Sequence, residues 1–311
     1  MAFVLHSTQQ HPKGDHLQTR LLATLLCLAA CDETVPAGKP VGTTVDTEAE
    51  IQRYLRRAYL DLSGAIPTEA ELTSQTARLR DGGNTPTVRG ELVDELLGGE
   101  KFSKVWIEEL ENGIFGGNTL EQQYAFVCGI VRSVDTSCNT CTATDSCACT
   151  CTSITYYNAE RTDLRTTAAD LRGGKQTSSI ERRYAKASGY FVLAGSPEGR
   201  VRSLFDDFLS RTAEPDEIEN GRAMILGAIF PNAPAGLMFH RHGSNYDDLL
   251  DIIFDSEVYR EAIVRRVFDR YLARSPKPNE LAHFLTTLDA NDPDARALLR
   301  AVASSKEYFE Q

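Results

Sequence analysis

Six cysteines are the residues of this chain whose type and spacing most clearly predict chemistry. Five of them lie in the short segment 138–151, which is rich in Thr, Ser, Asn and Asp and has almost no large apolar residue. A loop of this composition cannot be stabilised by burial, so it needs covalent cross-links or a metal ion. The six are Cys128, Cys138, Cys141, Cys147, Cys149 and Cys151.

Three disulfides are the first hypothesis, because six is an even number and an exported protein folds in an oxidising compartment. Six cysteines allow fifteen pairings. Neighbours in Cys147-x-Cys149-x-Cys151 are too close to pair easily, so each is expected to bond to a cysteine elsewhere. The alternative is a zinc site, in which Cys138, Cys141, Cys147 and Cys149 supply four thiolates.

A second candidate for chemistry is the pair His240-x-His242, followed by Asp247 and Asp251. Two imidazoles at this spacing on an extended segment can face the same side, and nearby carboxylates could complete a metal site. This pattern predicts a metal-dependent hydrolase as the alternative function. In the opposing interpretation both histidines are exposed loop residues, and the aspartates lie near a helix N-terminus, where the dipole favours them.

No recognised catalytic motif accompanies these residues. The sequence lacks a Gly-x-Ser-x-Gly elbow, a phosphate-binding loop, a dinucleotide fingerprint and a His-Glu-x-x-His helix. We therefore name no catalytic residue, expect no cofactor and favour a protein that is not an enzyme.

The start of the chain predicts a lipid anchor. Lys13 and Arg20 precede an apolar run at residues 21–30, which is too short to cross a bilayer. The run ends in Leu-Ala-Ala-Cys, which looks like a lipobox with Cys31 as the lipidated residue. We expect cleavage before Cys31 and attachment of the mature protein to a membrane of the cell envelope, facing the periplasm or the cell surface.

Net charge excludes one class of partner. The chain of 311 residues has a formal net charge of −11, and phosphate binding needs a basic surface. Nucleic acid is therefore not an expected partner. An acidic domain is also repelled by anionic lipids, so the lipid on Cys31 would have to hold it at the membrane.

A pattern of apolar helix, proline break and second helix recurs three times. In the C-terminal copy Tyr271 and Leu272 end one helix, and Glu280 and Leu281 begin the next one after Pro278. Proline in the first turn of a helix loses no hydrogen bond. The other copies contain Phe208, Leu209, Pro215, Glu217 and Ile218 and, nearer the start, Tyr59, Leu62, Pro67, Glu71 and Leu72.

These units predict an all-α fold, arranged as an irregular array because their spacing is uneven. Within the Cys-rich insertion, residues 153–157 and 190–193 are β-branched and aromatic and could form a short hairpin. The predicted organisation is a signal peptide at 1–30, a flexible tether at 31–47, the first helical unit at 48–111, the Cys-rich insertion and connecting segment at 112–199, and the second and third helical units at 200–311.

The first copy contains the run RRAYLDLSGAIPT at residues 56–68, then LVDELL at 92–97 and Phe102-x-x-x-Trp106. This combination resembles the start of an extracytoplasmic domain of unknown function, the planctomycete-type cytochrome-associated family. The C-terminal copy is similar to small helical repeats of secreted and surface bacterial proteins. The resemblance implies fold and location but no catalytic residue, and it brings no haem, because Thr142 follows Cys141 where covalent attachment needs histidine.

The sequence thus predicts a lipid-anchored extracytoplasmic structural or binding protein. We expect it to be an accessory or scaffold component of a cell-envelope assembly, with an envelope protein as its partner, because stacked helical units commonly form binding faces.

Overall fold

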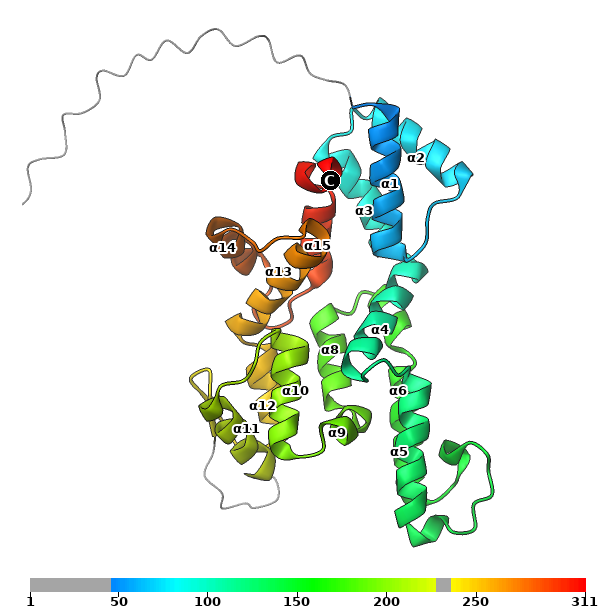
Figure 1. Cartoon of the computed structure of the whole chain (residues 1–311), viewed down its shortest axis with the longest axis vertical. Coiled ribbons are helices and arrows are strands. Elements are labelled where there is room, and N and C mark those ends of the chain that lie inside the picture. The colour runs from blue at the N-terminus through cyan, green and yellow to red at the C-terminus, as the bar shows by residue number, and fades with distance from the viewer. Residues whose placement is uncertain (1–45, 228–235) are drawn as a thin grey trace, which may run out of the picture. The chain divides into compact units, whose positions relative to one another are not determined.

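The computed structural model describes residues 46–227 and 236–311. The predicted signal peptide at 1–30, the lipidation site Cys31 and nearly all of the predicted tether at 31–47 lie outside the described residues. The described chain is mostly helical, as predicted (Figure 1). No helix among these residues is long and apolar enough to cross a membrane.

The first helical unit consists of α1 (Glu48–Ser63), α2 (Glu69–Asp81), α3 (Pro86–Leu97) and α4 (Glu100–Ile114). Helix α1 contacts the other three. Thr47 and Thr68 begin α1 and α2 with capping boxes, in which the threonine hydroxyl accepts from the third helical N–H and a glutamate side chain accepts from the threonine N–H. These local signals explain why the helices begin at these residues.

The middle of the chain is also helical. It contains α5 (Leu120–Val134), the 3-10 turns η1 (Thr136–Cys138) and η2 (Ser146–Ala148), and then α6 (Thr152–Leu164), α7 (Thr167–Arg172), α8 (Thr177–Lys186) and α9 (Ser188–Ala194). The hairpin expected at 153–157 and 190–193 is not present, because these residues belong to α6 and α9. The preference of β-branched residues for strands depends on their surroundings, and Ile154 and Leu164 are both buried at helical spacing in α6.

The last part of the chain contains α10 (Pro197–Leu209), α11 (Pro215–Gly227), α12 (Tyr246–Phe254), α13 (Glu257–Leu272), α14 (Pro278–Thr287), α15 (Ala295–Ala303) and α16 (Lys306–Glu310). A small antiparallel hairpin, β1 (Gly236–Met238) and β2 (Arg241–Gly243), precedes α12. The short hairpin therefore occurs 40 or more residues later than the sequence predicted, with Leu237 opposite His242.

The two later proline breaks share one arrangement. Ser210 and Ala273 end α10 and α13 with φ values of 52° and 51°, in the left-handed region. The arginine that follows donates two hydrogen bonds to the glutamate in the first turn of the next helix, at 2.8 and 2.6 Å from Arg211 to Glu217. In the third unit both bonds from Arg274 to Glu280 are 2.8 Å long.

Each of these arginines also lies over an aromatic ring of the preceding helix. Arg211 is 4.7 Å from the ring centroid of Phe205, and Arg274 is 5.0 Å from that of Phe268. The first unit differs, because its left-handed residue is Gly64 and the next residue is an alanine. We call the segments 210–217 and 273–280 the arginine junctions.

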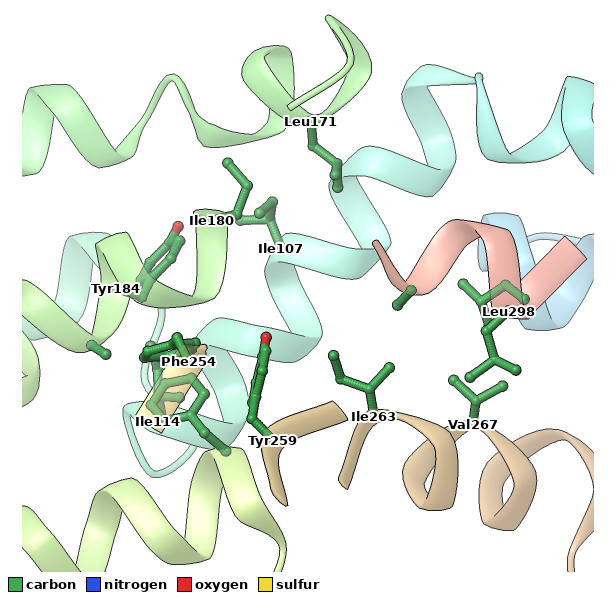
Figure 2. Close-up of a cluster of buried hydrophobic side chains, with 14 of the residues drawn as sticks. Ile107, Ile114, Leu171, Ile180, Tyr184, Phe254, Tyr259, Ile263, Val267 and Leu298 are labelled. Carbon is green, nitrogen blue, oxygen red and sulfur yellow. The ribbon is translucent and has the colours of Figure 1, made fainter. Parts of the chain in front are cut away.

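The end of the chain closes onto its first described helix. The Tyr308 hydroxyl donates to Asp61 at 2.7 Å, and the guanidinium of Arg57 lies 4.2 Å from the Tyr308 ring centroid. Helices α1 and α16 are thus packed together although they are far apart in sequence. One apolar core runs through α4, α8, α12, α13 and α15, where Ile107, Tyr184, Phe254, Ile263 and Leu298 are buried (Figure 2).

Candidate functional site

The cysteine-rich segment is a loop between α5 and α6 that three disulfides hold. The pairs are Cys128–Cys147, Cys138–Cys151 and Cys141–Cys149. The prediction of three disulfides is confirmed, and no cysteine of the 147-x-149-x-151 run bonds to another member of that run. Because every sulfur of the set is in a disulfide, no thiolates remain for the alternative zinc site.

Polar groups fix the parts of this loop that the disulfides do not. The Asp135 carboxylate accepts from the N–H of Ser137 at 2.9 Å and from the hydroxyl of Ser153 at 2.7 Å. The Ser137 and Ser153 hydroxyls, with that N–H, lower the pKa of Asp135. From α5, a guanidinium nitrogen of Arg132 donates to the Ala143 carbonyl at 2.9 Å. The loop is therefore ordered by cross-links and hydrogen bonds, and the fully buried apolar side chains that it contributes are cysteines: Cys138, Cys147 and Cys149.

The outward face of α5 carries no charge. Phe126, Ile130 and Val134 are 53%, 41% and 73% exposed and lie four residues apart, so they form one stripe along the helix. We call Phe126, Ile130 and Val134 the α5 face. Exposed apolar side chains grouped in this way mark interaction surfaces.

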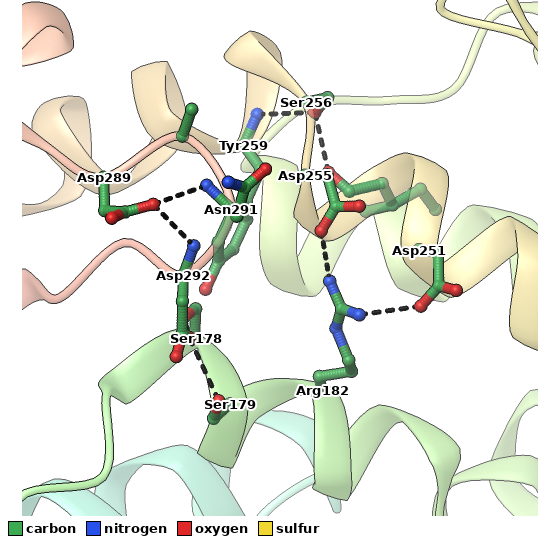
Figure 3. Close-up of polar contacts among 12 residues, drawn as sticks. Ser178, Ser179, Arg182, Asp251, Asp255, Ser256, Tyr259, Asp289, Asn291 and Asp292 are labelled. Atoms are coloured by element: carbon green, nitrogen blue, oxygen red, sulfur yellow. Dashed lines mark hydrogen bonds and ion pairs between the residues drawn. The ribbon is translucent and has the colours of Figure 1, made fainter.

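The His240 and His242 region forms a tight turn instead of a metal site. Phe239 and His240 occupy the turn of the β1–β2 hairpin with φ values of 49° and 63°, and both histidines are exposed. Both candidate aspartates lie in α12 and pair with α8: Asp247 with Lys186 at 2.8 Å, and Asp251 with Arg182 at 2.7 Å. Figure 3 shows the second pair, in which Arg182 also pairs with Asp255.

Within residues 46–227 and 236–311, one group of three or more possible ligands comes within 4.8 Å of one another, and it is Asp135, Cys138 and Cys151. The last two form a disulfide. His240, His242, Asp247 and Asp251 are not brought together, so the geometry gives the metal-dependent hydrolase no support.

A cleft of about 230 Å³ opens between α4, α8, α10 and α13. Its walls include Trp106, Leu110, Ile263 and Val267, and its charged residues are Glu109, Glu181, Asp207, Arg266 and Arg270. Ile263 and Val267 can be followed in Figure 2, where they extend from α13 toward the core. Apolar walls with a few convergent polar groups are typical of small-molecule sites. We call this the Asp207 cleft.

Four of the five charged groups in the cleft are already paired with one another. Glu109 accepts two hydrogen bonds from Arg270. Glu181 accepts from the Tyr259 hydroxyl at 2.8 Å and lies 3.3 Å from Arg266. Burial would lower the pKa of Arg266, but the negative charge of Glu181 raises it above the ordinary value. Both arginines therefore remain charged and already have carboxylate partners.

Asp207 is the exception. One carboxylate oxygen, Oδ2, accepts from the Tyr190 hydroxyl at 2.9 Å, and no described residue donates to the other oxygen. Burial raises the pKa of Asp207 to about 6, because removal of water disfavours the charged form. The nearby Asp206 raises it further, while the Tyr190 hydrogen bond lowers it.

The sequence patterns did not point to this cleft. A usable signal is the presence of acids on helix faces that are otherwise buried: Glu181 lies beside Ile180, Tyr184 and Ala185 in α8. Charged residues are rarely buried without a partner, so an acid on such a face predicts a buried polar site. The partner residues come from distant helices, and only the fold identifies them.

Comparisons of the chain with protein-family models, with curated proteins and with solved structures find no match. The resemblance of the first helical unit to the planctomycete-type cytochrome-associated domain stays a prediction.

Proposed function

We propose that this protein is a lipid-anchored extracytoplasmic binding protein and an accessory or scaffold component of a cell-envelope assembly. The observation that carries this proposal is the disulfide-clamped α5–α6 hairpin with its exposed, uncharged α5 face. Disulfides persist in oxidising compartments outside the cytosol. The three disulfides of this loop therefore support a location outside the cytosol.

The α5 face supports the binding part of the proposal. Its occupant would be an envelope protein that presents an apolar helix face, because the stripe of Phe126, Ile130 and Val134 has helical spacing and no charged side chain. Such a contact would depend on apolar burial, which contributes roughly 25 cal/mol per Å². Binding at this face should therefore change little between low and high salt.

The lipid anchor is tested by Cys31→Ser in the full chain, with Cys27→Ser as the matched control. We expect the wild type and Cys27→Ser proteins in the membrane fraction and Cys31→Ser in the soluble fraction. Mass spectrometry of the N-terminal peptide should show the lipid on Cys31. An unchanged membrane fraction for Cys31→Ser, or an unmodified cysteine, contradicts the anchor.

The docking face is tested by a photo-cross-linking amino acid at position 126, with position 60 as the control. Phe126 and Leu60 are both 53% exposed, and Leu60 lies on α1, away from the α5 face. We expect a single adduct from position 126 in intact envelopes, lost when Ile130→Asp is added, and no such adduct from position 60. Equal adducts from both positions, or an adduct that survives Ile130→Asp, contradict docking here.

A further inference from the structure

We propose that the Asp207 cleft binds a small organic cation, with its ammonium group at the free oxygen of Asp207 and its apolar body against Trp106. Binding at this site requires neither the lipid anchor nor the α5 face, so its test is independent of the proposed function.

The size and walls of the cleft select a compact ligand. Its volume of about 230 Å³ is below the range of about 300–1,000 Å³ typical of drug-sized ligands. One wall is α4, which contributes Trp106 and Leu110, and the opposite wall is α13, which contributes Ile263 and Val267. Aliphatic and aromatic groups on facing walls suit a single ring or a short alkyl chain.

The charged residues of the cleft favour a positively charged ligand. Two arginines face three carboxylates there, so the lining carries one negative charge in excess when all are ionised. Arg270 is held by Glu109, and Arg266 lies against Glu181. An anion would have to displace one of these carboxylates, whereas a cation meets the unshared oxygen of Asp207. A charged donor at a carboxylate forms one of the stronger hydrogen bonds available in proteins.

The surroundings of Asp207 also favour a positively charged ligand. Tyr190 from α9 orients its carboxylate by a 2.9 Å hydrogen bond, and a guanidinium nitrogen of Arg266 lies 3.5 Å from its main-chain oxygen rather than its side chain. The carboxylate is thus fixed in place but not neutralised. The raised pKa of Asp207 reflects the free-energy cost of a partly buried carboxylate that has no cationic partner. A bound ammonium group would offset part of that cost.

The chain provides its own reporter, because Trp106 is its one tryptophan. We would titrate the full protein at pH 7.5 with phenethylamine and follow the fluorescence of Trp106, with 2-phenylethanol as the neutral analogue of the same shape. We expect saturable binding of the amine, at least tenfold tighter than that of the alcohol. Absence of saturable amine binding, or equal affinity for the alcohol, overturns the proposal.

Asp207→Asn should weaken amine binding at least tenfold and leave alcohol binding unchanged. Asp206→Asn is the matched control, because Asp206 is the exposed neighbour on the same helix and acts on Asp207 only through its charge; it should weaken amine binding far less than Asp207→Asn does. Circular dichroism and urea unfolding verify that each variant is folded. If Asp207→Asn binds the amine like the wild type, or if Asp206→Asn weakens binding equally, Asp207 is not the recognition group. The comparison of amine with alcohol on the wild type decides the outcome even if a variant does not fold.

Discussion

The disulfide-clamped loop and the arginine junctions both connect packed helices, but different interactions hold them. Between α5 and α6 the chain uses three disulfides and the side chains of Asp135 and Asp145, which accept from main-chain N–H groups. Between α13 and α14 it uses one arginine, which bonds to Glu280 and Glu307 and stacks on Phe268. The second unit repeats this arrangement with Arg211, Glu217 and Phe205.

The difference follows from the residues that each connection can bury. A junction begins at a helix end that carries a phenylalanine, so a guanidinium can stack on the ring while it pairs with a carboxylate. The loop 135–151 offers no aromatic residue and little apolar surface. Its conformational entropy must therefore be reduced covalently. Non-covalent junctions suffice where the last five residues of the preceding helix include a phenylalanine, as in α10 and α13 but not in α5.

We expect the largest change in stability from the disulfides of the loop 135–151. Replacing the pair Cys128 and Cys147 by serine should lower the free energy of unfolding by about 3 kcal/mol, the chain-entropy value for a closed loop of this length. Both cysteines are fully buried, and they are 19 residues apart. Urea unfolding measures the loss. The pair Cys141 and Cys149, 8 residues apart, is the control and should cost less. A larger cost for this inner pair would contradict an entropic role for the disulfides.

Gly64→Ala probes the one proline break that has no arginine. Gly64 has φ +66°, and an added Cβ would lie 2.7 Å from a methyl group of Val105. We expect a loss of about 2 kcal/mol, from left-handed strain together with that contact. Gly83→Ala is the control, since Gly83 has φ +71° with open space around it, and it should cost about 1 kcal/mol from strain alone. Equal losses in urea unfolding would show that the contact with Val105 is relieved at no cost.

Arg274→Gln should lower stability by about 1 kcal/mol, because it removes a partly exposed, bidentate pair. Arg274 lowers the pKa of Glu280 to about 2 from its ordinary 4.5. The stability from this pair is therefore present above about pH 4.5 and is lost as the pH falls toward 2. The difference in urea midpoint between wild type and variant should therefore be smaller at pH 3 than at pH 7. Arg211 pairs with one carboxylate, whereas Arg274 pairs with two. Arg211→Gln should therefore lower the free energy of unfolding at pH 7 by less than Arg274→Gln does.

The smallest expected change is an increase in stability. Ala273→Gly places glycine at a left-handed position, so it should raise stability by about 0.5 kcal/mol, after the higher entropy of the unfolded glycine chain is subtracted. Ala282→Gly in the exposed face of α14 is the opposite control and should lower stability by about 1 kcal/mol. Thermal unfolding of the two variants should shift in opposite directions. A loss with Ala273→Gly would show that this position is not strained.

Several features could be predicted from the sequence because their causes are local. Apolar residues at helical spacing, proline in a first turn and threonine three residues before glutamate or glutamine predict helices and their starts, and α1, α2 and α5 carry such caps. The short hairpin was predicted at the wrong place, because β-branched residues bury equally well on a helix when a neighbouring helix covers them. Ile154 in α6 is such a residue.

The sequence by itself determined that this protein is helical and that its six cysteines between residues 128 and 151 form disulfides. Both conclusions follow from composition, spacing and an even count. The tertiary structure alone decided which cysteines pair, that an arginine connects the helices at two breaks, and that Glu181 and Asp207 share a cleft with Arg266. These facts depend on contacts between helices far apart in the chain. Such contacts are selected by the burial of the whole core, which no local pattern encodes.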